Sequence, residues 1–338
     1  MSERKLASVR EIREILPIEK ADSLELALID GWKVVVKKGE FKPGDHCVYC
    51  EIDSILPDIP EFEFLKPRKH RIKTIKLRGQ LSQGIAFPVN ILDIFGHGPV
   101  NPDNLKPGDD VTELMGVTKY ELPVTHSMNA QSKGYFPGFL RKTDEERIQN
   151  CSWIIEKYGD QPWYITEKLD GTSFTAYYNQ DDFGVCSRNL ELEEGDNLYW
   201  RIAKELDLEF ALKMTRNLAV QGEIIGPGIQ GNIYNLDKPE LYLFNIYDID
   251  TGQYGNLTDL LWFCHAFKIK NVPLLDMNIN LPGSVDEILE MADGDAFLNP
   301  KVQREGLVFR PMQELEDIRH GRVSFKAISN QYLLKQEN

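Results

Sequence analysis

Short apolar stretches separated by polar turns dominate the first third of the chain. Residues 32–36, 47–52 and 84–89 are rich in β-branched and aromatic side chains, and a Pro-Gly turn at residues 41–45 separates the first two. Strands at this spacing predict a small β-barrel of the OB type, which is a common platform for nucleic acids. We therefore expect residues 1–120 to form one barrel domain.

A mixed pattern of strands and helices follows in the second part of the chain. Residues 121–140 include the small polar run 129–134, whose composition is typical of a linker. Beyond this junction, the apolar run Trp163–Ile165 and the stretch 241–249 predict strands. The chain is therefore predicted to be an α+β protein, with a second domain at residues 141–338.

Two helices are predicted within this second domain. Thr143 can cap a helix, and Glu146 lies three residues further on, as in a capping box. Residues 196–214 form an amphipathic pattern, whose apolar side chains at helical spacing are Leu198, Ile202, Leu206 and Phe210. We expect this longer helix to be scaffold rather than part of a site.

Composition narrows the class of protein. The 338 residues are 42% hydrophobic, and no apolar run is long enough to span a bilayer. The net charge of −14 argues against a general nucleic-acid coat, although it allows a local basic groove. Five cysteines, an odd number, and the absence of an apolar leader lead us to expect a cytoplasmic protein.

Cys47 and Cys50 form a C-x-x-C pattern beside His46, which could indicate zinc. There is no second such pair, and residues 48–52 have the pattern of a strand. We therefore predict that both cysteines lie in the core.

One segment reverses the acidic character of the chain. Residues 66–78 contain no acid, and phosphate backbone is the natural partner of such a segment in an acidic protein. A solvated loop with an edge strand is the alternative, because lysines also protect strand edges. The basic side chains are Lys66, Arg68, Lys69, Arg71, Lys73, Lys76 and Arg78.

The stretch from Thr166 to Ser173 carries the strongest chemical signal. Lys168 and Asp170 follow the apolar run Trp163–Ile165, so a strand that continued would point both side chains to one face. One group could then attack a phosphorus while the other helps to hold a metal or a ribose. Gly171 allows close approach of the backbone.

Further motifs follow downstream. Glu223 lies inside an apolar strand, where a carboxylate is usually paired or functional because its burial is costly. The others are Ser187-Arg188-Asn189, the run 241–249 with Phe244, the pair Glu305-Gly306, and Lys326 in a final strand.

The stretch Gly226–Gly231 matches the dinucleotide fingerprint G-x-G-x-x-G. That motif needs a helix directly after it, so that the helix N-terminus faces the pyrophosphate. Asn232, Asn235 and Pro239 follow instead, and they make a helix untenable. We exclude a Rossmann site, and the sequence contains no P-loop motif.

Taken in order, these motifs resemble the series of the covalent nucleotidyltransferases, which comprise ATP-dependent RNA and DNA ligases and mRNA capping enzymes. The resemblance covers residues 140–330, and the stretch Gly222–Gly231 is similar to the third motif of nick-sealing RNA ligases. An upstream barrel resembles the two-domain RNA ligases that join 3′-OH and 5′-phosphate ends at nicks in duplex RNA. The resemblance implies antiparallel sheets with flanking helices in the second domain.

The resemblance also implies a role for each motif residue. Lys168 would form lysyl-AMP with ATP and then pass AMP to an RNA 5′-phosphate. A neutral lysine is required, and we expect Lys326 and a bound cation to lower its pKa. The metal, Mg²⁺ or Mn²⁺, would be held by Asp170, Glu223 and Glu305. ATP would be bound by Glu167, Asp170, Gly171, Arg188, Glu223, Phe244, Arg147 and Lys326, of which Lys326 also grips the α-phosphate.

One departure and several alternatives remain. Many relatives carry K-x-K in the last motif, whereas Ser324 occupies its first position here, and Arg322 or Lys335 could supply the missing charge. A DNA ligase or a GTP-using capping-type transferase is the alternative enzyme. A catalytically inert RNA-binding protein is the alternative from another class.

Overall fold

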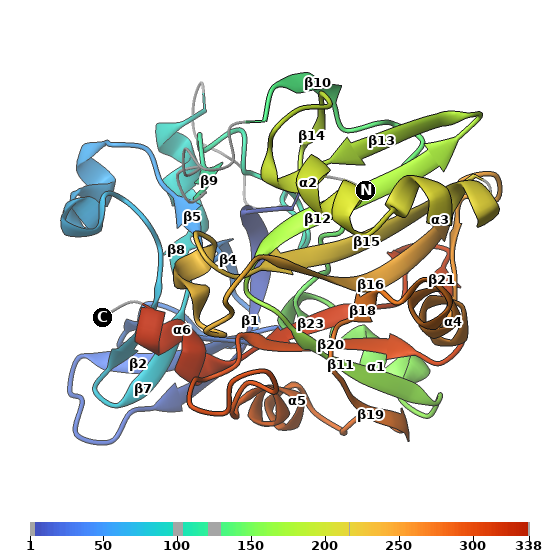
Figure 1. The fold of residues 1–338 in the computed structure, drawn as a ribbon. Coiled ribbons are helices and arrows are strands. Elements are labelled where there is room, and N and C mark those ends of the chain that lie inside the picture. The colour runs from blue at the N-terminus through green and yellow to red at the C-terminus, as the bar shows by residue number, and fades with distance from the viewer. Residues whose placement is uncertain (1–3, 97–103, 121–129, 216, 337–338) are drawn as a thin grey trace. The chain divides into compact units, whose positions relative to one another are not determined.

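The computed structural model describes residues 4–96, 104–120, 130–215 and 217–336, and these form two compact units (Figure 1). The C-terminal unit comprises Pro123–Tyr332, and the N-terminal unit comprises Ser2–Leu122 together with Leu333–Asn338. Among the described helices, none combines the length and the apolar character that crossing a membrane requires.

The N-terminal unit is built on a five-stranded antiparallel sheet in the order β3-β2-β1-β4-β8. Strand β1 is long and serves two partners, because Ile12–Pro17 pair with β2 and Ala7–Glu11 pair with β4. Its buried side chains pack with Trp32 and Tyr49 in one core. The strands are β1 (Ala7–Pro17), β2 (Leu24–Ile29), β3 (Trp32–Lys37), β4 (His46–Cys50) and β8 (Ile85–Pro88).

Shorter elements complete this unit. A two-residue turn, Arg78-Gly79, joins β6 to β7, and both residues have positive φ, 50° and 82°, as a type I′ hairpin requires. From the other end of the chain, Leu333 packs against the core. The elements are β5 (Ser54–Ile55), η1 (Pro60–Arg68), β6 (Thr74–Leu77), β7 (Gln80–Gln83), η2 (Val89–Ile94) and β9 (Thr118–Lys119).

Cys47 and Cys50 are free thiols that are buried in β4, as predicted. Burial raises the pKa of the Cys47 thiol to about 12, so it stays protonated and behaves as a small apolar side chain. No group of three potential metal ligands occurs in the described part of the chain.

The C-terminal unit contains two main sheets. The larger one runs β10-β14-β13-β12-β15-β16-β17, with β18 parallel to β16, and the smaller one runs β19-β11-β20-β23. The larger sheet consists of β10 (Ser132–Tyr135), β12 (Thr172–Asn179), β13 (Asp182–Cys186), β14 (Leu190–Leu192), β15 (Leu218–Ile225), β16 (Glu240–Asp248), β17 (Gln253–Tyr254) and β18 (Lys270–Asn271). The smaller sheet consists of β11 (Trp163–Lys168), β19 (Leu274–Ile279), β20 (Gly306–Pro311) and β23 (Phe325–Ile328), and a separate hairpin of β21 (Glu316–Asp317) and β22 (Gly321–Arg322).

Helices cover these sheets. Side chains of α2, α3 and α4 share one apolar core with the larger sheet, and those of α1 and α5 share another with the smaller sheet. The antiparallel pairing and the flanking helices confirm the predicted α+β class. The helices are η5 (Ile148–Asn150), α1 (Trp153–Tyr158), α2 (Leu198–Glu205), α3 (Leu208–Thr215), η6 (Gln230–Asn232), α4 (Leu257–Phe267), α5 (Val285–Ala292) and α6 (Asn330–Gln336).

The helix predicted to start at Thr143 is wrong, because helical structure begins only at Ile148. The preceding backbone is used by β23, where the N–H of Lys326 donates to the carbonyl of Glu146 and Arg147 forms a β-bridge with Lys326. Thr143 bonds Ser173 through its hydroxyl instead of capping a helix. Tertiary hydrogen bonds therefore override a local capping pattern.

The single helix predicted at residues 196–214 is two helices, α2 and α3. Asp207, with a φ of 48°, breaks the helix between them. The break rotates the apolar face, so that Leu208 and Leu212 are buried whereas Phe210 is 55% exposed. Upstream, residues 132–135 of the predicted junction form edge strand β10, which pairs with β14.

Two glycines of the N-terminal unit provide a matched test of its packing. Both Gly84 (φ 94°) and Gly79 (φ 82°) need a left-handed conformation, which costs alanine about 1–2 kcal/mol. A Cβ on Gly84 would lie 2.4 Å from the Tyr49 ring, whereas a Cβ on Gly79 meets nothing within 4 Å. Gly84→Ala should thus lower the free energy of unfolding by about 1–3 kcal/mol more than Gly79→Ala, measured by denaturant titration with fluorescence detection. Equal losses would contradict this packing.

Candidate active site

Lys168 is the last residue of β11, a strand held between β19 and β20. In register, Lys168 lies opposite Gly306, next to Glu305. The chain leaves the strand directly afterwards, and Leu169 is buried in an apolar cluster with Tyr234. We had expected strand alternation to point Asp170 and Lys168 to the same face. The strand ends at Lys168, so the position of Asp170 is set by the turn that follows β11.

Three carboxylates act on the Lys168 ammonium. Its Nζ lies 2.7 Å from Glu305 Oε2, and the charges of Glu223 and Asp170 add to the field. Burial would lower the pKa of Lys168, but these acids outweigh burial and raise it. This net rise is opposite to the lowering that we expected, so Lys168 is an ammonium in the ligand-free protein.

The acids of this cluster are themselves poorly satisfied. Glu223 accepts no hydrogen bond and forms no ion pair within the described residues. Burial, partly offset by Lys168, raises the pKa of Glu223 to about 8. Burial and then the charge of Glu305 raise the pKa of Asp170 to about 7. The Glu223 carboxyl therefore stays protonated up to about pH 8, and the cluster reaches its full negative charge only above that pH.

This donor set fits a hard divalent cation, which prefers carboxylate oxygens. The predicted trio of Asp170, Glu223 and Glu305 does not form a closed cage, since no three potential ligands converge among the residues described. An open arrangement is nevertheless what Mg²⁺ commonly uses, with one or two carboxylates completed by waters and phosphates.

Gly171 is required by close packing. A Cβ on it would lie 2.3 Å from the carbonyl oxygen of Ile224 and 2.8 Å from Cγ of Glu223. The glycine thus lets the turn after Lys168 lie directly against β15, the strand that carries Glu223.

Glu167 presents a vacant hydrogen-bond acceptor. It is 1% exposed, and its Oε2 accepts the N–H of Phe297 at 2.7 Å. Its Oε1 is buried and has no hydrogen-bond partner among the residues that the structure describes. Burial raises the pKa of Glu167. A donor such as the amino group of adenine would satisfy this oxygen.

Phe244, which the resemblance assigns to ATP binding, is half-buried on β16. The guanidinium of Arg310 lies 5.8 Å from the centroid of its ring.

The predicted nucleotide-binding cations Arg147, Arg188 and Lys326 come from three segments of the chain. Arg147 is 5% exposed, and its bridge to Lys326 brings the two residues side by side. Arg188 is held differently, because its Nη2 donates to both carboxylate oxygens of Asp144 at 2.7 and 2.8 Å. Its side chain remains 42% exposed.

Ser324 joins a buried, charge-balanced network. Its hydroxyl donates to Glu145, whose pKa is kept low by Arg310 and Arg322 although burial opposes this. Arg322 is also bound to Glu314 and lies 3.7 Å from the Tyr254 ring centroid, so its charge is already balanced within this network. Lys335 belongs to the N-terminal unit.

The residues that hold the turn after Lys168 were not among the predicted site residues. Tyr234 and Tyr332 contact Asp170 from 64 and 162 residues away. Arg310 and Glu145 were also missed, and they are 165 residues apart. Such partners leave no local pattern; a buried charge inside a strand, as at Arg310, was the one available signal.

The basic segment of the N-terminal unit is mostly exposed. Arg71 is the exception, because it pairs with Asp53 at 2.7 Å and lies 3.7 Å from the Tyr120 ring centroid. Lys73 is half-buried. The side chains open to solvent are Lys66, Arg68, Lys69, Lys76 and Arg78.

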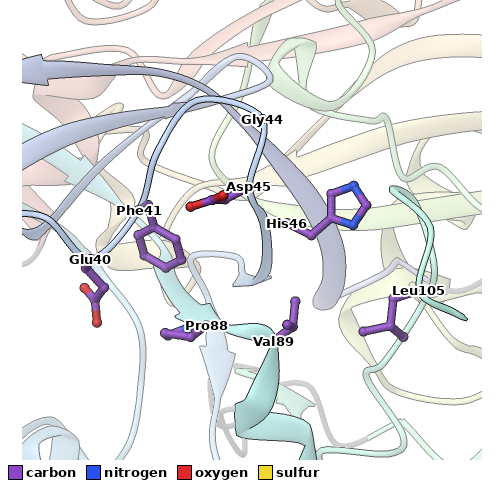
Figure 2. Close-up of a pocket in the computed structure, with 8 residues that line it drawn as sticks. All are labelled: Glu40, Phe41, Gly44, Asp45, His46, Pro88, Val89 and Leu105. Carbon is purple, nitrogen blue, oxygen red and sulfur yellow. The ribbon is translucent and has the colours of Figure 1, made fainter. Parts of the chain in front are cut away.

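A shallow pocket of about 570 Å³ also lies in the N-terminal unit (Figure 2). It is lined by Phe41, His46 and Pro88, with the carboxylates of Glu40 and Asp45 at its edge. Both carboxylates already accept backbone N–H groups of nearby turns. The pocket contains no residue of the predicted site.

The raised pKa of Glu223 predicts a pH-dependent stability. Between about pH 5 and about pH 8 the folded state keeps a proton on Glu223 that the unfolded chain loses, so stability falls as pH rises. Glu223→Gln should raise the unfolding temperature of the metal-free protein above about pH 8 and leave it unchanged near pH 5. Glu156→Gln, at an exposed position, is the control. If Glu223→Gln were less stable than wild type above about pH 8, the ionised Glu223 carboxylate would not destabilise the folded protein, and the prediction would be wrong.

Comparisons with known proteins agree with this geometry. Residues 6–89 match the family model of an OB-fold domain, and residues 161–328 match that of RNA ligase. A ligand-free Asp-to-Ala mutant of Naegleria gruberi RNA ligase is 41% identical with a TM-score of 0.90, covering 100% of this chain and 99% of that chain.

Two further structures of that ligase are equally similar over nearly the whole chain. One, with PPi, is 42% identical with a TM-score of 0.90, and covers 99% of each chain. The other, a Lys-to-Ala mutant with ATP and Mn, is 41% identical with a TM-score of 0.88, and covers 99% of each chain. The N-terminal unit is therefore an OB fold, and the protein belongs to the RNA ligase family.

Proposed function

We propose that this RNA ligase uses ATP and a divalent cation to join 3′-OH and 5′-phosphate ends at nicks in duplex RNA, and so serves RNA repair. The observation that carries the proposal is the position of Lys168 at the end of β11 among three carboxylates, with Glu223 unpartnered among the described residues. Structures of the similar Naegleria gruberi ligase contain ATP, AMP, PPi or Mn, which supports the same ligands here.

In the first step, Lys168 Nζ attacks the α-phosphorus of ATP, which forms a phosphoramide bond and releases pyrophosphate. Nζ must first lose a proton, and Glu305 Oε2, 2.7 Å away, is the acceptor in contact with it. A bound divalent cation would offset the negative charge of the carboxylates and the phosphates, and so favour the neutral amine.

The remaining steps transfer AMP to RNA. The 5′-phosphate of the RNA attacks the phosphorus of lysyl-AMP and releases Lys168, and the 3′-OH on the other side of the nick then attacks the RNA 5′-phosphorus and displaces AMP. Arg188, which is exposed, is suited to bind the RNA phosphate, while Arg147 and Lys326 contact the phosphates of the nucleotide.

Glu167 supports a choice of ATP over GTP. Its vacant Oε1 is an acceptor, so it can bind the 6-amino group of adenine and disfavours the 6-oxo group of guanine. Phe244 offers an aromatic face for the base. These features disfavour the GTP-using alternative.

Lys168→Ala should abolish covalent labelling by α-labelled ATP, because the nucleophile is gone. Lys204→Ala, which changes an exposed lysine on α2, should label normally. The measurement is denaturing electrophoresis after incubation with Mg²⁺ or Mn²⁺, with labelled GTP in parallel. Label that persists in Lys168→Ala, or that comes only from GTP, would reject the proposal.

The OB fold and its basic segment are proposed to bind the RNA backbone. Changing Lys69, Lys76 and Arg78 to alanine should weaken binding of nicked duplex RNA and reduce the slope of log K against log salt by up to about 3, or about one unit for each lost phosphate contact. Lys37, Lys38 and Lys42 are exposed in the same unit, so the triple alanine variant is a charge-matched control. Equal effects of the two triple variants would show that only net charge matters.

A further inference from the structure

The turn after the nucleophile is held by three buried tyrosine hydroxyls. Tyr332 donates to Asp170 Oδ2 at 2.5 Å, and Tyr234 accepts the N–H of Asp170 at 2.7 Å. The Tyr199 hydroxyl lies 3.0 Å from Thr172 Oγ1. These tyrosines are 7%, 3% and 3% exposed, and they come from three separate segments of the C-terminal unit.

Tyr332 is fixed by its own surroundings. Its backbone N–H donates to Ser329 Oγ, and Ser329 Oγ donates in turn to Asp293 Oδ1 at 2.6 Å. The side chain of Gln331 bonds the other oxygen of Asp293. The hydroxyl of Tyr332 is thus presented to Asp170 by a segment that is anchored independently of any ligand.

Tyr234 is presented by the loop that contains the G-x-G-x-x-G stretch. Gly228 and Gly231 have positive φ values of 80° and 68°, which give the loop its tight course. Asn299 Nδ2 donates to the carbonyl of Ile233 and fixes the loop beside Tyr234. The glycine-rich stretch therefore leads the chain to a tyrosine whose hydroxyl contacts the turn after Lys168.

Asp170 needs such support because its neighbours repel it. Glu305 acts on it with a like charge, and Lys168 is the cation that offsets this repulsion. When Lys168 becomes a neutral nucleophile, that offset is lost while the carboxylates stay close. A neutral O–H donor keeps its attraction for the carboxylate throughout this change.

We propose that Tyr332 and Tyr234 are positioning residues that hold Asp170 by its Oδ2 and its N–H, and so present its Oδ1 to the nucleotide and the cation. Oδ1 has no hydrogen-bond partner among the residues that the structure describes. The inference rests on the proposed function of Lys168 and Asp170. It makes α6, which follows the last motif, part of the adenylation machinery.

Tyr332→Phe tests this by removing one hydroxyl and keeping the ring. The full-length variant should bind α,β-methylene-ATP with Mn²⁺ about 10–100-fold more weakly than wild type in calorimetric titration, as is typical when a group that orients a metal-binding carboxylate is lost. Tyr178→Phe is the matched control, because Tyr178 is 6% exposed and its hydroxyl also bonds an aspartate, Asp181. It should bind as wild type does. Binding of wild-type strength by Tyr332→Phe would overturn the inference.

A double-mutant cycle separates positioning from general stability. If Tyr332 acts through Asp170, then Tyr332→Phe should add nothing to the loss of binding caused by Asp170→Asn. Losses that multiply would show that Tyr332 acts by another route and would overturn the inference. If Tyr332→Phe unfolds at a lower temperature than Tyr178→Phe, its binding loss could come from lower stability. The same double-mutant cycle is then made with Tyr234→Phe and Asp170→Asn, because Tyr234 also holds Asp170. Losses that multiply in this cycle would overturn the inference.

The outcome can be separated from that of the proposed function. Wild-type protein that binds the analogue but forms no lysyl-AMP with ATP would reject the ligase chemistry, whatever the tyrosine variants do. Wild-type labelling together with normal analogue binding by Tyr332→Phe would reject only the positioning role.

Discussion

Lys168 carries one positive charge and faces three carboxylates, those of Asp170, Glu223 and Glu305. Neighbouring carboxylates that are partly buried repel each other when they are ionised. A carboxylate whose pKa is raised in this way lowers the stability of the folded chain at high pH. The acids stay together because two sheets and their helical cores fix β15, which carries Glu223, and the ends of β11 and β20, beside which Asp170 and Glu305 lie. The C-terminal unit is thus less stable because of this cluster, and binding of a cation and a nucleotide can relieve the repulsion.

In a second charged cluster of the same unit, the charges are balanced. Glu145 is matched by Arg310 and Arg322, and Ser324 donates to its remaining oxygen. Every strong charge there has a partner, so the cluster is structural and holds the segment of Arg147 against β23. The cluster around Lys168 lacks such matched partners, and this difference distinguishes it from the structural network around Glu145.

The sequence predicted those features that depend on neighbours along the chain. The strand ending at Lys168 and the buried cysteines of β4 follow from local patterns, and both are confirmed. Features set by distant partners were missed or mistaken. The capping pattern at Thr143 was overridden by hydrogen bonds with β23, and the pKa of Lys168 is raised chiefly by Glu305 and Glu223, which are distant in sequence. The tyrosines around Asp170 likewise depend on contacts that no short window of sequence contains.

Leu333 closes the core of the N-terminal unit, although that unit otherwise consists of residues up to Leu122. Its core therefore cannot be completed during synthesis until the ribosome has translated past residue 332. The N-terminal unit is synthesised first, but one side chain that packs against its core is synthesised last. Until then, the apolar surface against which Leu333 packs lacks this one partly buried side chain.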